Sequence, residues 1–476
     1  MRCLLPLTLL LLAAPVAAQE GSASDDIWFR IEDAKGQLIG FQRESRRAAA
    51  DLVRIERERR VAFRIVGQPP TEQWVREMRE EDPSGRVRSL TIESIINGRR
   101  SFSRLTLAGQ TLLIEQGRGT RTASRQVPAS GLLRFGDSEA LLGLGEAGPG
   151  ANYLEIEAGS LVPTTTRLQA YAADPAVSGQ KPALVAAREN GPMLIWLVER
   201  DGEGQIVRAE QPLLGGGHIF VRSERPIQPA ELSRWRSTHG QAIEAPYAIP
   251  AAALRGKLRY TFGLRAALPL ALPQTPDQQV RPGPGPGQVR LDICDGCGPG
   301  LSTAPADLAR WRLPTPWLQA DAPELVNAAG QARKPDRSES QVMEHLRRLV
   351  AKRINVVDAF GHVSAREAWR SRNGDCTEHA ALLAALARAA GIPARVASGM
   401  AYGADGYFGV EDGFQAHSWV LAYVDGRWQS FDSALERLDA GHVALTIGDG
   451  DPGPISAASR ISGLLEWQAM SEVKPL

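Results

Sequence analysis

The segment GDCTEHAALLAALARAAGIPAR, residues 374–395, constrains the fold more than any other stretch of the chain. Residues 380–390 are apolar on nearly every side of a helix, until Gly391 and Pro393 end it. A helix of this kind must be covered on all sides, so the pattern predicts a buried central helix. Gly374 and Asp375 break the preceding structure, which places Cys376 at the start of that helix.

A cysteine at a helix N-terminus lies beside unpaired N–H groups and the positive end of the helix dipole. Both features stabilise a thiolate, so the position predicts a lowered pKa for Cys376. The same helix end offers a backbone N–H to an oxyanion. The alternative is a small buried cysteine with no chemical role.

Two further residues in FQAHSWVLAYVDGRWQSFD, residues 414–432, favour the chemical role. Residues 419–424 and 428–431 have the pattern of two strands, and Asp425-Gly426 between them predicts a type I′ hairpin. His417 and Asp432 flank this hairpin at its open end, so we expect them side by side. Nucleophile Cys376, base His417 and orienter Asp432 then form a triad.

These three blocks resemble the transglutaminase-like superfamily over residues 320–450. GDCTEHAALLAALARAAGIPAR is similar to its Cys motif, HSWVLAYVDGRW to its His motif and SFDSAL to its Asp motif, although Ser433 stands where the family often has Pro. The resemblance implies a papain-like arrangement of a Cys helix on an antiparallel sheet. It also implies that Cys376, His417 and Asp432 are catalytic and that the chemistry is acyl transfer from an amide. GHVALTIGDGD, residues 441–451, resembles the tail of exported bacterial members.

Other residues near the triad have weaker claims. Trp369 and Asn373 precede the nucleophile and are candidates for an oxyanion donor or pocket wall, with core packing as the alternative for Trp369. Trp419 is expected to pack beside the imidazole and shield it. His379 lies at i+3 from Cys376 on the same helix, where it points alongside the cysteine, so it is not expected to be the base.

The region from 19 to 275 has a repeated β pattern. IWFRI and LIGFQ flank the turn DAKGQ, and MLIWLV and QIVRAE flank RDGEG, which predicts two hairpins. Alternating apolar residues between Leu90 and Ile114 predict strands with one solvated face. The fold class is therefore α+β, with a large antiparallel β-rich region of one or two modules before the papain-like domain.

Residues 276–319 contain the alternating Pro/Gly run RPGPGPGQ and are interpreted as a linker or long surface loop. The domain of residues 320–450 follows, with capping-box signatures at Ser338/Gln341 and Ser364/Glu367, and residues 451–476 are interpreted as a C-terminal tail. Cys294 and Cys297 in the 276–319 segment form a CxxC that lacks the further ligands of a zinc site, so a local disulfide or two free thiols remain as alternatives.

Residues 1–18 have the pattern of a signal peptide, with Val16 and Ala18 at the cleavage-site positions, and no later segment has the pattern of a membrane span. The chain is therefore expected to be exported, to a periplasm or the medium. Its 55 basic and 54 acidic residues give no field that would attract nucleic acid. No metal or cofactor motif is present, because the sequence has no phosphate loop after a strand, no HExxH and no EF-hand spacing.

Together these features predict an exported cysteine-dependent acyl-transfer enzyme that acts on protein or peptide amides, with cell-envelope material as a candidate substrate. Hydrolysis is favoured over crosslinking, because the sequence shows neither an acidic cluster for calcium control nor a clear aromatic tunnel for an amine. Two alternatives stay open: a protein-glutamine transamidase, and a cell-envelope binding or scaffold protein whose triad is idle.

Overall fold

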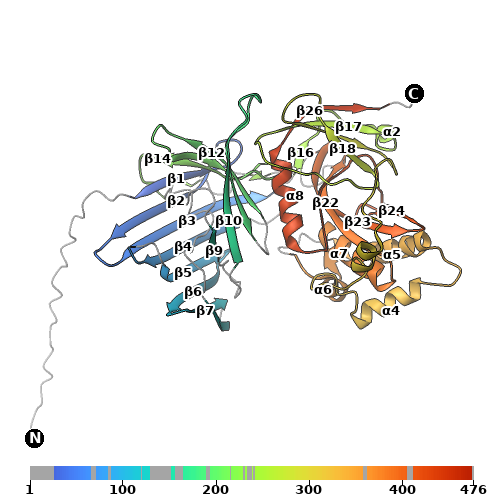
Figure 1. Ribbon diagram of the computed structural model, residues 1–476, viewed down its shortest axis with the longest axis horizontal. Helices are drawn as coiled ribbons and strands as arrows, with labels where there is room; N and C mark the ends of the chain where they lie inside the picture. Colours follow the sequence, from blue (N-terminus) through green and yellow to red (C-terminus); the bar gives the residue numbers. More distant parts are fainter. Residues whose placement is uncertain are drawn as a thin grey trace, which may run out of the picture.

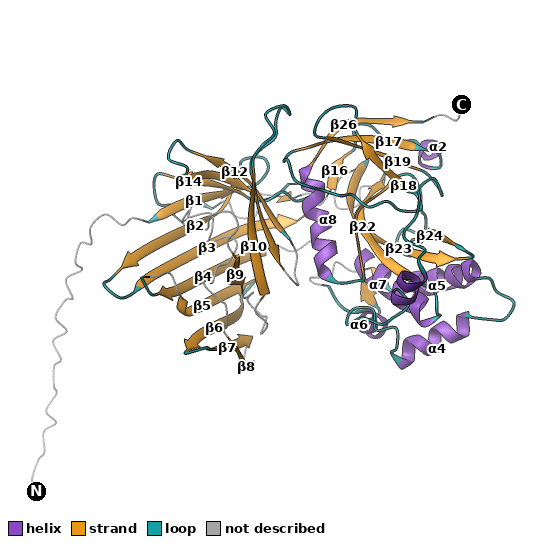
Figure 2. Ribbon diagram, in the orientation of Figure 1, coloured by secondary structure: helices purple, strands orange, loops and turns teal. Residues whose placement is uncertain are grey.

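The computed structural model describes residues 26–65, 71–83, 87–118, 121–128, 152–155, 164–188, 193–214, 216–228, 231–232, 238–239, 242–356, 362–404 and 411–473. The expected signal peptide, residues 1–18, lies outside these ranges. Within them, no helix is both long and apolar enough to cross a membrane. A large antiparallel sheet built from the N-terminal half lies beside a mixed α/β region built from the C-terminal half (Figures 1 and 2), so the predicted α+β class is confirmed.

The N-terminal sheet follows the chain almost strand by strand, in the order β8-β7-β6-β5-β4-β3-β2-β1-β14-β13-β12-β11-β10-β9. Hairpins β1–β2 and β12–β13 are the two that the sequence predicts. The strands are β1 (Ile27–Glu32), β2 (Leu38–Ala48), β3 (Val53–Ile65), β4 (Thr71–Glu81), β5 (Val87–Ile96), β6 (Arg99–Ala108), β7 (Thr111–Arg118), β8 (Arg121–Pro128), β9 (Asn152–Glu155), β10 (Thr164–Tyr171), β11 (Ala183–Arg188), β12 (Leu194–Arg200), β13 (Ile206–Glu210) and β14 (Ile219–Ser223).

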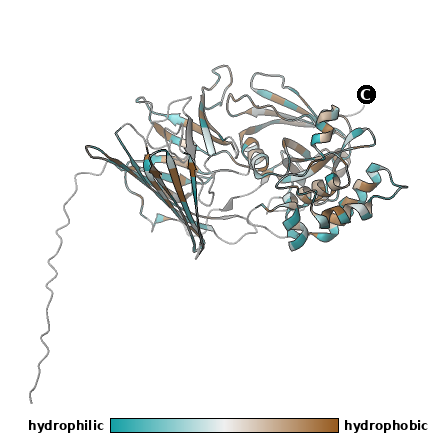
Figure 3. Cartoon of the chain, turned by 60° about the horizontal axis from the view of Figure 1, so that its bottom comes forward, coloured by the Kyte–Doolittle hydropathy of each residue, from teal (hydrophilic) through white to brown (hydrophobic). Residues whose placement is uncertain are grey.

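Alternation of apolar and polar residues explains this sheet (Figure 3). Leu90, Ile92, Leu105 and Ile114 are buried together on one face of β5, β6 and β7, as their spacing predicts. The buried face also carries charge, since the Arg57 side chain lies 3.1 Å from Glu44 and 3.2 Å from Glu77 on the two neighbouring strands. Burial raises the pKa of Glu44 to about 7, against the opposing effect of Arg57.

The C-terminal region is built around helix α7 (Cys376–Ala389). Its interior residues are buried on all sides, among α4 (Pro323–Ala332), α5 (Glu339–Arg353), α6 (Ala365–Ser371) and the sheet β16-β23-β22-β25 with β24. These strands are β16 (Ala242–Glu244), β22 (Ala394–Gly403), β23 (Gly413–Val424), β24 (Arg427–Phe431) and β25 (His442–Gly448). Short elements complete the region: α2 (Ala251–Leu254), α3 (Pro305–Arg310), β20 (Asn355–Val356) and β21 (Asn373–Gly374). The short strand β15 (Thr238–His239) instead pairs with β3 of the N-terminal sheet.

Several local predictions for this region are confirmed. Ser338 and Gln341 form the capping box of α5, and the Ser364 side chain accepts a hydrogen bond from the Glu367 backbone N–H at the start of α6. The hairpin β23–β24 turns at Asp425-Gly426, where both residues have positive φ as a type I′ turn requires.

Two domain interpretations are wrong. Residues 276–319 are not a linker, because β18 (Gln278–Pro282) and β19 (Gln288–Ile293) form a hairpin around the Pro/Gly run, and β19 pairs with β17 (Leu258–Leu264). Residues 451–476 are not a tail, because α8 (Pro452–Leu464) is a helix and β26 (Leu465–Glu472) pairs with the other edge of β17. Both segments lack a strong local helix or strand pattern. Their structure comes from pairing with strands that are distant in the sequence.

Helix α8 joins the two halves of the molecule (Figure 1). The Leu214 backbone N–H donates to the Ser459 carbonyl at 3.0 Å, and the Arg265 guanidinium bonds both the Gly463 carbonyl and Glu210 of β13. Leu464 belongs to one apolar cluster with buried residues of β11 and β12. The C-terminal segment therefore holds the N-terminal sheet against the α/β region.

We expect the same substitution to have opposite effects at two helical glycines. A Cβ at Gly463 would overlap the backbone nitrogen of Leu213, whereas a Cβ at Gly330 of α4 would meet nothing within 4 Å. Gly463→Ala should lower the free energy of unfolding by about 1–3 kcal/mol through overpacking. Gly330→Ala should raise it by about 0.5–1 kcal/mol through helix propensity.

Denaturant unfolding of the purified full chain measures both effects. Equal changes in the free energy of unfolding for the two variants would show that the close approach of α8 to the Leu213 segment does not affect stability.

Candidate active site

A capping box fixes the point at which α7 begins. The Asp375 carboxylate accepts from the Thr377 backbone N–H at 2.8 Å, and the Glu378 carboxylate accepts from the Asp375 backbone N–H at 3.0 Å. Cys376 is therefore the first residue of the helix, as predicted. Its backbone N–H is one of those that have no carbonyl partner within the helix.

Cys376 lies against the strand that carries His417. One edge of β23 pairs with β22 along ten residues, while the other edge pairs with β16 at Gly413–Gln415 and with β24 at Val420–Val424. Among the described residues, no strand pairs with this second edge of β23 between Gln415 and Val420. The N-terminus of α7 meets the strand there, with the Cys376 sulfur 3.9 Å from the Ala416 carbonyl oxygen.

His417 and Asp432 are brought together as the hairpin predicts. The Nε2 atom of His417 lies 2.7 Å from Oδ2 of Asp432, and both side chains are buried. A carboxylate at this nitrogen holds the proton on Nε2 and leaves Nδ1 to accept a proton. Trp419 lies nearly parallel to the His417 ring, with centroids 6.1 Å apart, so the predicted packing beside the imidazole is confirmed.

Asp432 receives four hydrogen bonds although it is buried. Oδ2 accepts from His417 and, at 3.2 Å, from Nε2 of His442, and Oδ1 accepts from the backbone N–H groups of Ala434 and Leu435 at 2.8 and 3.1 Å. Burial alone would raise the pKa of Asp432, but the charges and hydrogen bonds of the two histidines hold it far below its usual range. The orienting group is therefore a carboxylate at any working pH.

His442, the first residue of β25, is the contact that the sequence analysis missed. Its Nδ1 lies 3.1 Å from Oδ1 of Asp439, and its ring centroid lies 5.6 Å from that of His417. Gly399 makes this approach possible, because a Cβ there would overlap the Val443 carbonyl oxygen next to His442. In the sequence, His442 lies in the segment GHVALTIGDGD, whose resemblance to the tail of exported family members does not identify a site residue.

The family model of the transglutaminase-like superfamily matches residues 326–433, a range that contains Cys376, His417 and Asp432. These residues form a transglutaminase-like domain. No curated protein matches the chain in sequence.

Three solved structures show partial similarity to the chain. A "putative cysteine protease" from Cytophaga hutchinsonii is 18% identical, with 46% of this chain and 84% of that chain covered and a TM-score of 0.28. A "putative protease" from Parabacteroides distasonis is 13% identical, with 76% and 68% covered and a TM-score of 0.20. A "beta-barrel-like protein" of a domain of unknown function from Brucella abortus is 10% identical, with 43% and 97% covered and a TM-score of 0.29.

The environment of the thiol in this transglutaminase-like domain differs from the expectation of a lowered pKa. Burial raises the pKa of Cys376 well above its ordinary value, and the Asp375 carboxylate raises it further. The Ser418 backbone N–H and the helix N-terminus act in the opposite direction but do not outweigh burial. The resting thiol is therefore protonated near neutral pH, and a base must remove its proton.

The remaining candidates of the sequence analysis lie around the triad without touching it in the described contacts. Trp369 packs on α5, where the Arg353 guanidinium lies 3.4 Å from its ring centroid. Asn373 is exposed, in the short parallel pair β20–β21. His379 is buried with its Nδ1 3.3 Å from the Ser433 hydroxyl, and burial lowers its pKa. These positions give Trp369 a packing role, and neither Asn373 nor His379 contacts Cys376, His417 or Asp432 among the described hydrogen bonds.

His417, Asp432 and His442 are also the group of ligand atoms that could hold a metal ion, since these atoms lie within 4.8 Å of one another. The 2.7 Å separation of His417 Nε2 from Asp432 Oδ2 is that of a hydrogen bond. Two ligands of a tetrahedral zinc ion with bonds of about 2.0–2.2 Å lie roughly 3.3 Å apart. The arrangement therefore fits protons better than a metal.

A pocket of about 370 Å³ lies at the other end of α7, between Ala390 and the segment after α4. Arg333 on its wall donates to the Ala390 carbonyl, and Arg337 donates to the Ala332 carbonyl at 2.8 Å. These cations satisfy helix C-termini. Because α7 has 14 residues, the pocket is about 20 Å from Cys376 and is not part of the triad site.

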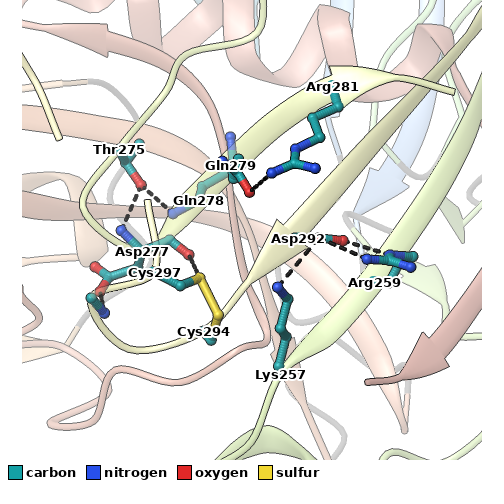
Figure 4. Close-up of a disulfide and its surroundings, with 11 residues drawn as sticks. Lys257, Arg259, Thr275, Asp277, Gln278, Gln279, Arg281, Asp292, Cys294 and Cys297 are labelled. Carbon is teal, nitrogen blue, oxygen red and sulfur yellow. Dashed lines mark hydrogen bonds and ion pairs between the residues drawn. A yellow bond between two sulfur atoms is a disulfide. The ribbon is translucent and has the colours of Figure 1, made fainter. Parts of the chain in front are cut away.

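Cys294 and Cys297 form a disulfide that supports the strand leading to Asp432 (Figure 4). The Asp277 carbonyl accepts from the Cys294 backbone N–H at 3.0 Å. The Asp277 carboxylate accepts from the Gly296 backbone N–H at 2.9 Å and from the Ser430 hydroxyl of β24. Burial raises the pKa of Asp277, against the effect of these two bonds. The CxxC loop therefore buttresses β24 two residues before Asp432.

Removing this disulfide should weaken the fold measurably. The closed loop is short, so a double Cys294→Ser, Cys297→Ser variant should lose about 2 kcal/mol of unfolding free energy by the loop-entropy relation. Dithiothreitol should produce the same loss in the wild-type chain and no loss in the variant, in thermal or denaturant unfolding. A wild-type transition that reductant does not move would contradict the buttressing role.

Proposed function

We propose that this chain is an exported cysteine-dependent acyl-transfer enzyme that hydrolyses protein or peptide amides. The observation that supports this most directly is the meeting of the α7 N-terminus with the uncovered edge of β23, beside a His417 whose Nε2 is held by Asp432. Nucleophile, base and orienter come from a helix and two strands of one packed core. Such rigid placement is what nucleophilic catalysis requires.

The first step is proton transfer, because the raised pKa of Cys376 keeps the thiol protonated at rest. Nδ1 of His417 takes the Cys376 proton as the sulfur attacks the carbonyl carbon of the amide, which gives a tetrahedral oxyanion and an imidazolium. Asp432 stabilises that imidazolium through the bond at Nε2. The Cys376 backbone N–H, unpaired within the helix, is placed to stabilise the oxyanion.

The C–N bond then breaks, and the leaving amine takes the proton from His417. The product on the enzyme is a thioester on Cys376. Water attacks the thioester while His417 accepts its proton, the C–S bond breaks, and the sulfur recovers that proton as the acid product leaves.

The aromatic residues near the triad favour water over an amine as acceptor. A transamidase needs an apolar tunnel that admits an amine and excludes water. Trp369 is engaged by Arg353, and Trp419 is buried against His417 and His442. Trp419 is therefore not available to line such a tunnel, and Arg353 covers one face of the half-buried Trp369.

The proposal also includes export of the chain and substrates from the cell envelope. The apolar leader with its cleavage-site residues supports export, and a disulfide in the mature chain is consistent with an oxidising compartment. Amide bonds of envelope proteins or peptides are the substrates such a compartment supplies.

Alkylation tests the pairing of nucleophile and base without a known substrate. Iodoacetamide should modify Cys376 at a rate that rises with pH, since thiolate is the reactive form and burial raises the thiol pKa. His417→Ala should slow this reaction at least about tenfold near neutral pH because the base is lost. His345→Gln, an exposed position on α5, is the control and should react like the wild type.

Peptide mass mapping assigns the modified residue and gives its rate. Equal alkylation rates in the wild type and His417→Ala would mean that the histidine does not activate the thiol of Cys376. That result would leave the idle scaffold as the better description.

A second experiment identifies the acyl acceptor. The chain is incubated with an envelope protein and peptide pool and a labelled primary amine, with Cys376→Ala as control. We expect a thioester adduct on Cys376 and new carboxyl termini or ammonia, all absent in the variant. Cys376-dependent incorporation of amine in excess of hydrolysis would instead identify a transamidase.

A further inference from the structure

A second histidine stands behind the triad in a position that the proposed mechanism does not use. The His442 side chain is 3% exposed and connects two carboxylates, with Nε2 3.2 Å from Asp432 and Nδ1 3.1 Å from Asp439. It lies outside the residues matched by the family model, which end at 433. The Asp439 backbone N–H also approaches Nδ1, at 3.4 Å, a longer contact than the 3.1 Å to the Asp439 carboxylate. When both nitrogens donate to the two carboxylates, the ring carries two protons and a positive charge.

Charged and titratable groups from several segments lie near His442, whereas its pairing partner in β22 is Ala401. Asp432 follows β24, His417 lies on β23, and Asp439 lies in the loop before β25, where Arg437 pairs with it at 2.9 Å. Asp277 is near enough for the charge of His442 to lower its pKa. His379, the remaining histidine near Asp432, bonds Ser433 and does not reach the carboxylate in the described contacts.

These neighbours decide the protonation state of His442. Burial alone would lower its pKa, but the hydrogen bonds and charges of Asp432 and Asp439 raise it to about 9. Burial likewise would raise the pKa of Asp439, and the bond and charge of His442 lower it. The imidazolium is therefore the resting form at neutral pH.

We propose that His442 is a positioning residue which, as a buried cation, holds Asp432 toward His417 and lowers the proton affinity of the Cys376–His417 pair. This inference rests on the proposed function, because it assigns a role relative to that pair. His442 does not touch the reacting atoms in this assignment. It acts through the carboxylate that it shares with His417.

Two physical effects carry the assignment. First, Asp439 fixes the direction of the ring, so that Nε2 of His442 meets Asp432 on the same oxygen that His417 uses. Secondly, a positive charge whose ring centroid is 5.6 Å from that of His417 disfavours a second positive charge there. Without this cation, Asp432 would hold the His417 proton more tightly and the base would be available only at higher pH.

The pH profile of iodoacetamide alkylation at Cys376 measures the proton affinity of the pair. Loss of a neighbouring positive charge makes removal of a proton from the pair less favourable, so the midpoint of the profile should move to higher pH. His442→Gln, which keeps an amide donor and loses the charge, should move this midpoint upward by roughly one pH unit. His345→Gln makes the same chemical change on the exposed face of α5 and should leave the midpoint in place.

A purely structural role gives a different result. If His442 only fills space, His442→Gln would lower the melting temperature or scale the alkylation rate equally at every pH, with an unchanged midpoint. That outcome overturns the inference. The proposed function is tested by a different variant. It fails if His417→Ala is alkylated at the same rate as the wild type.

The charge on His442 can be tested in the wild-type chain, so the inference does not depend on a variant that folds. NMR titration of the ring carbons of labelled histidine should show one buried histidine, assigned by its absence in His442→Gln spectra or by contacts to Trp419, that stays protonated to about pH 9. A His442 signal that loses its proton below pH 7 would overturn the inference.

The pH dependence of the melting temperature is an independent test of the charge on His442. A histidine whose folded pKa is raised from the ordinary value of about 6.5 stabilises the fold fully below that pH and loses the contribution as pH rises through about 9. The wild-type melting temperature should therefore fall more between pH 6.5 and 9.5 than that of His442→Gln. Parallel curves would contradict a charged His442.

Discussion

The buried carboxylate of Asp432 is the group on which the rest of the site depends. A charge placed in a protein interior is strongly unfavourable unless donors surround it. Here four donors do so, two from imidazole rings and two from the backbone that follows. Because His417 lies on β23 and His442 on β25, the two rings fix the position of the carboxylate, and the bond at Nε2 leaves Nδ1 of His417 as the accepting nitrogen.

The fold meets this requirement by bringing strands from distant parts of the chain to one place. His417 lies in the middle of β23, opposite Gly399 of β22. The missing side chain at Gly399 and the register shift between Ser398 and Gly399 let β25 come close enough for His442 to reach Asp432. Behind β24, the disulfide loop and Asp277 hold Ser430, so the strand that ends at Asp432 is supported from both sides.

Sequence patterns predicted the features that depend on neighbours in the chain. The all-apolar helix with Cys376 at its start, the Asp425-Gly426 hairpin that aligns His417 with Asp432, and the alternating strands of the N-terminal sheet each follow from the conformational preferences of short segments. The family resemblance covered the same stretch, and residues 326–433 match that family.

Features that depend on distant segments were not predictable in this way. The pairing of β26 with β17 gives structure to a segment interpreted as a tail, and the β18–β19 hairpin does the same for a Pro/Gly run interpreted as a linker. The role of His442 was not predicted, because it depends on the register shift in the long-range pairing of β22 with β25. The thiol pKa was predicted in the wrong direction since burial, a tertiary property, outweighs the helix terminus.

In the proposed mechanism, the charges of the buried cluster affect how readily His417 takes up and releases a proton. With Asp432 and Asp439 ionised and His442 protonated, the cluster carries one net negative charge at rest, apart from the partly exposed Arg437. Transfer of the thiol proton to His417 adds one positive charge and makes the cluster neutral. A neutral His442 would leave two negative charges that hold the proton on His417, which must later pass to the leaving amine. The cation therefore keeps His417 able both to take and to release a proton, which a base that becomes an acid within one cycle requires.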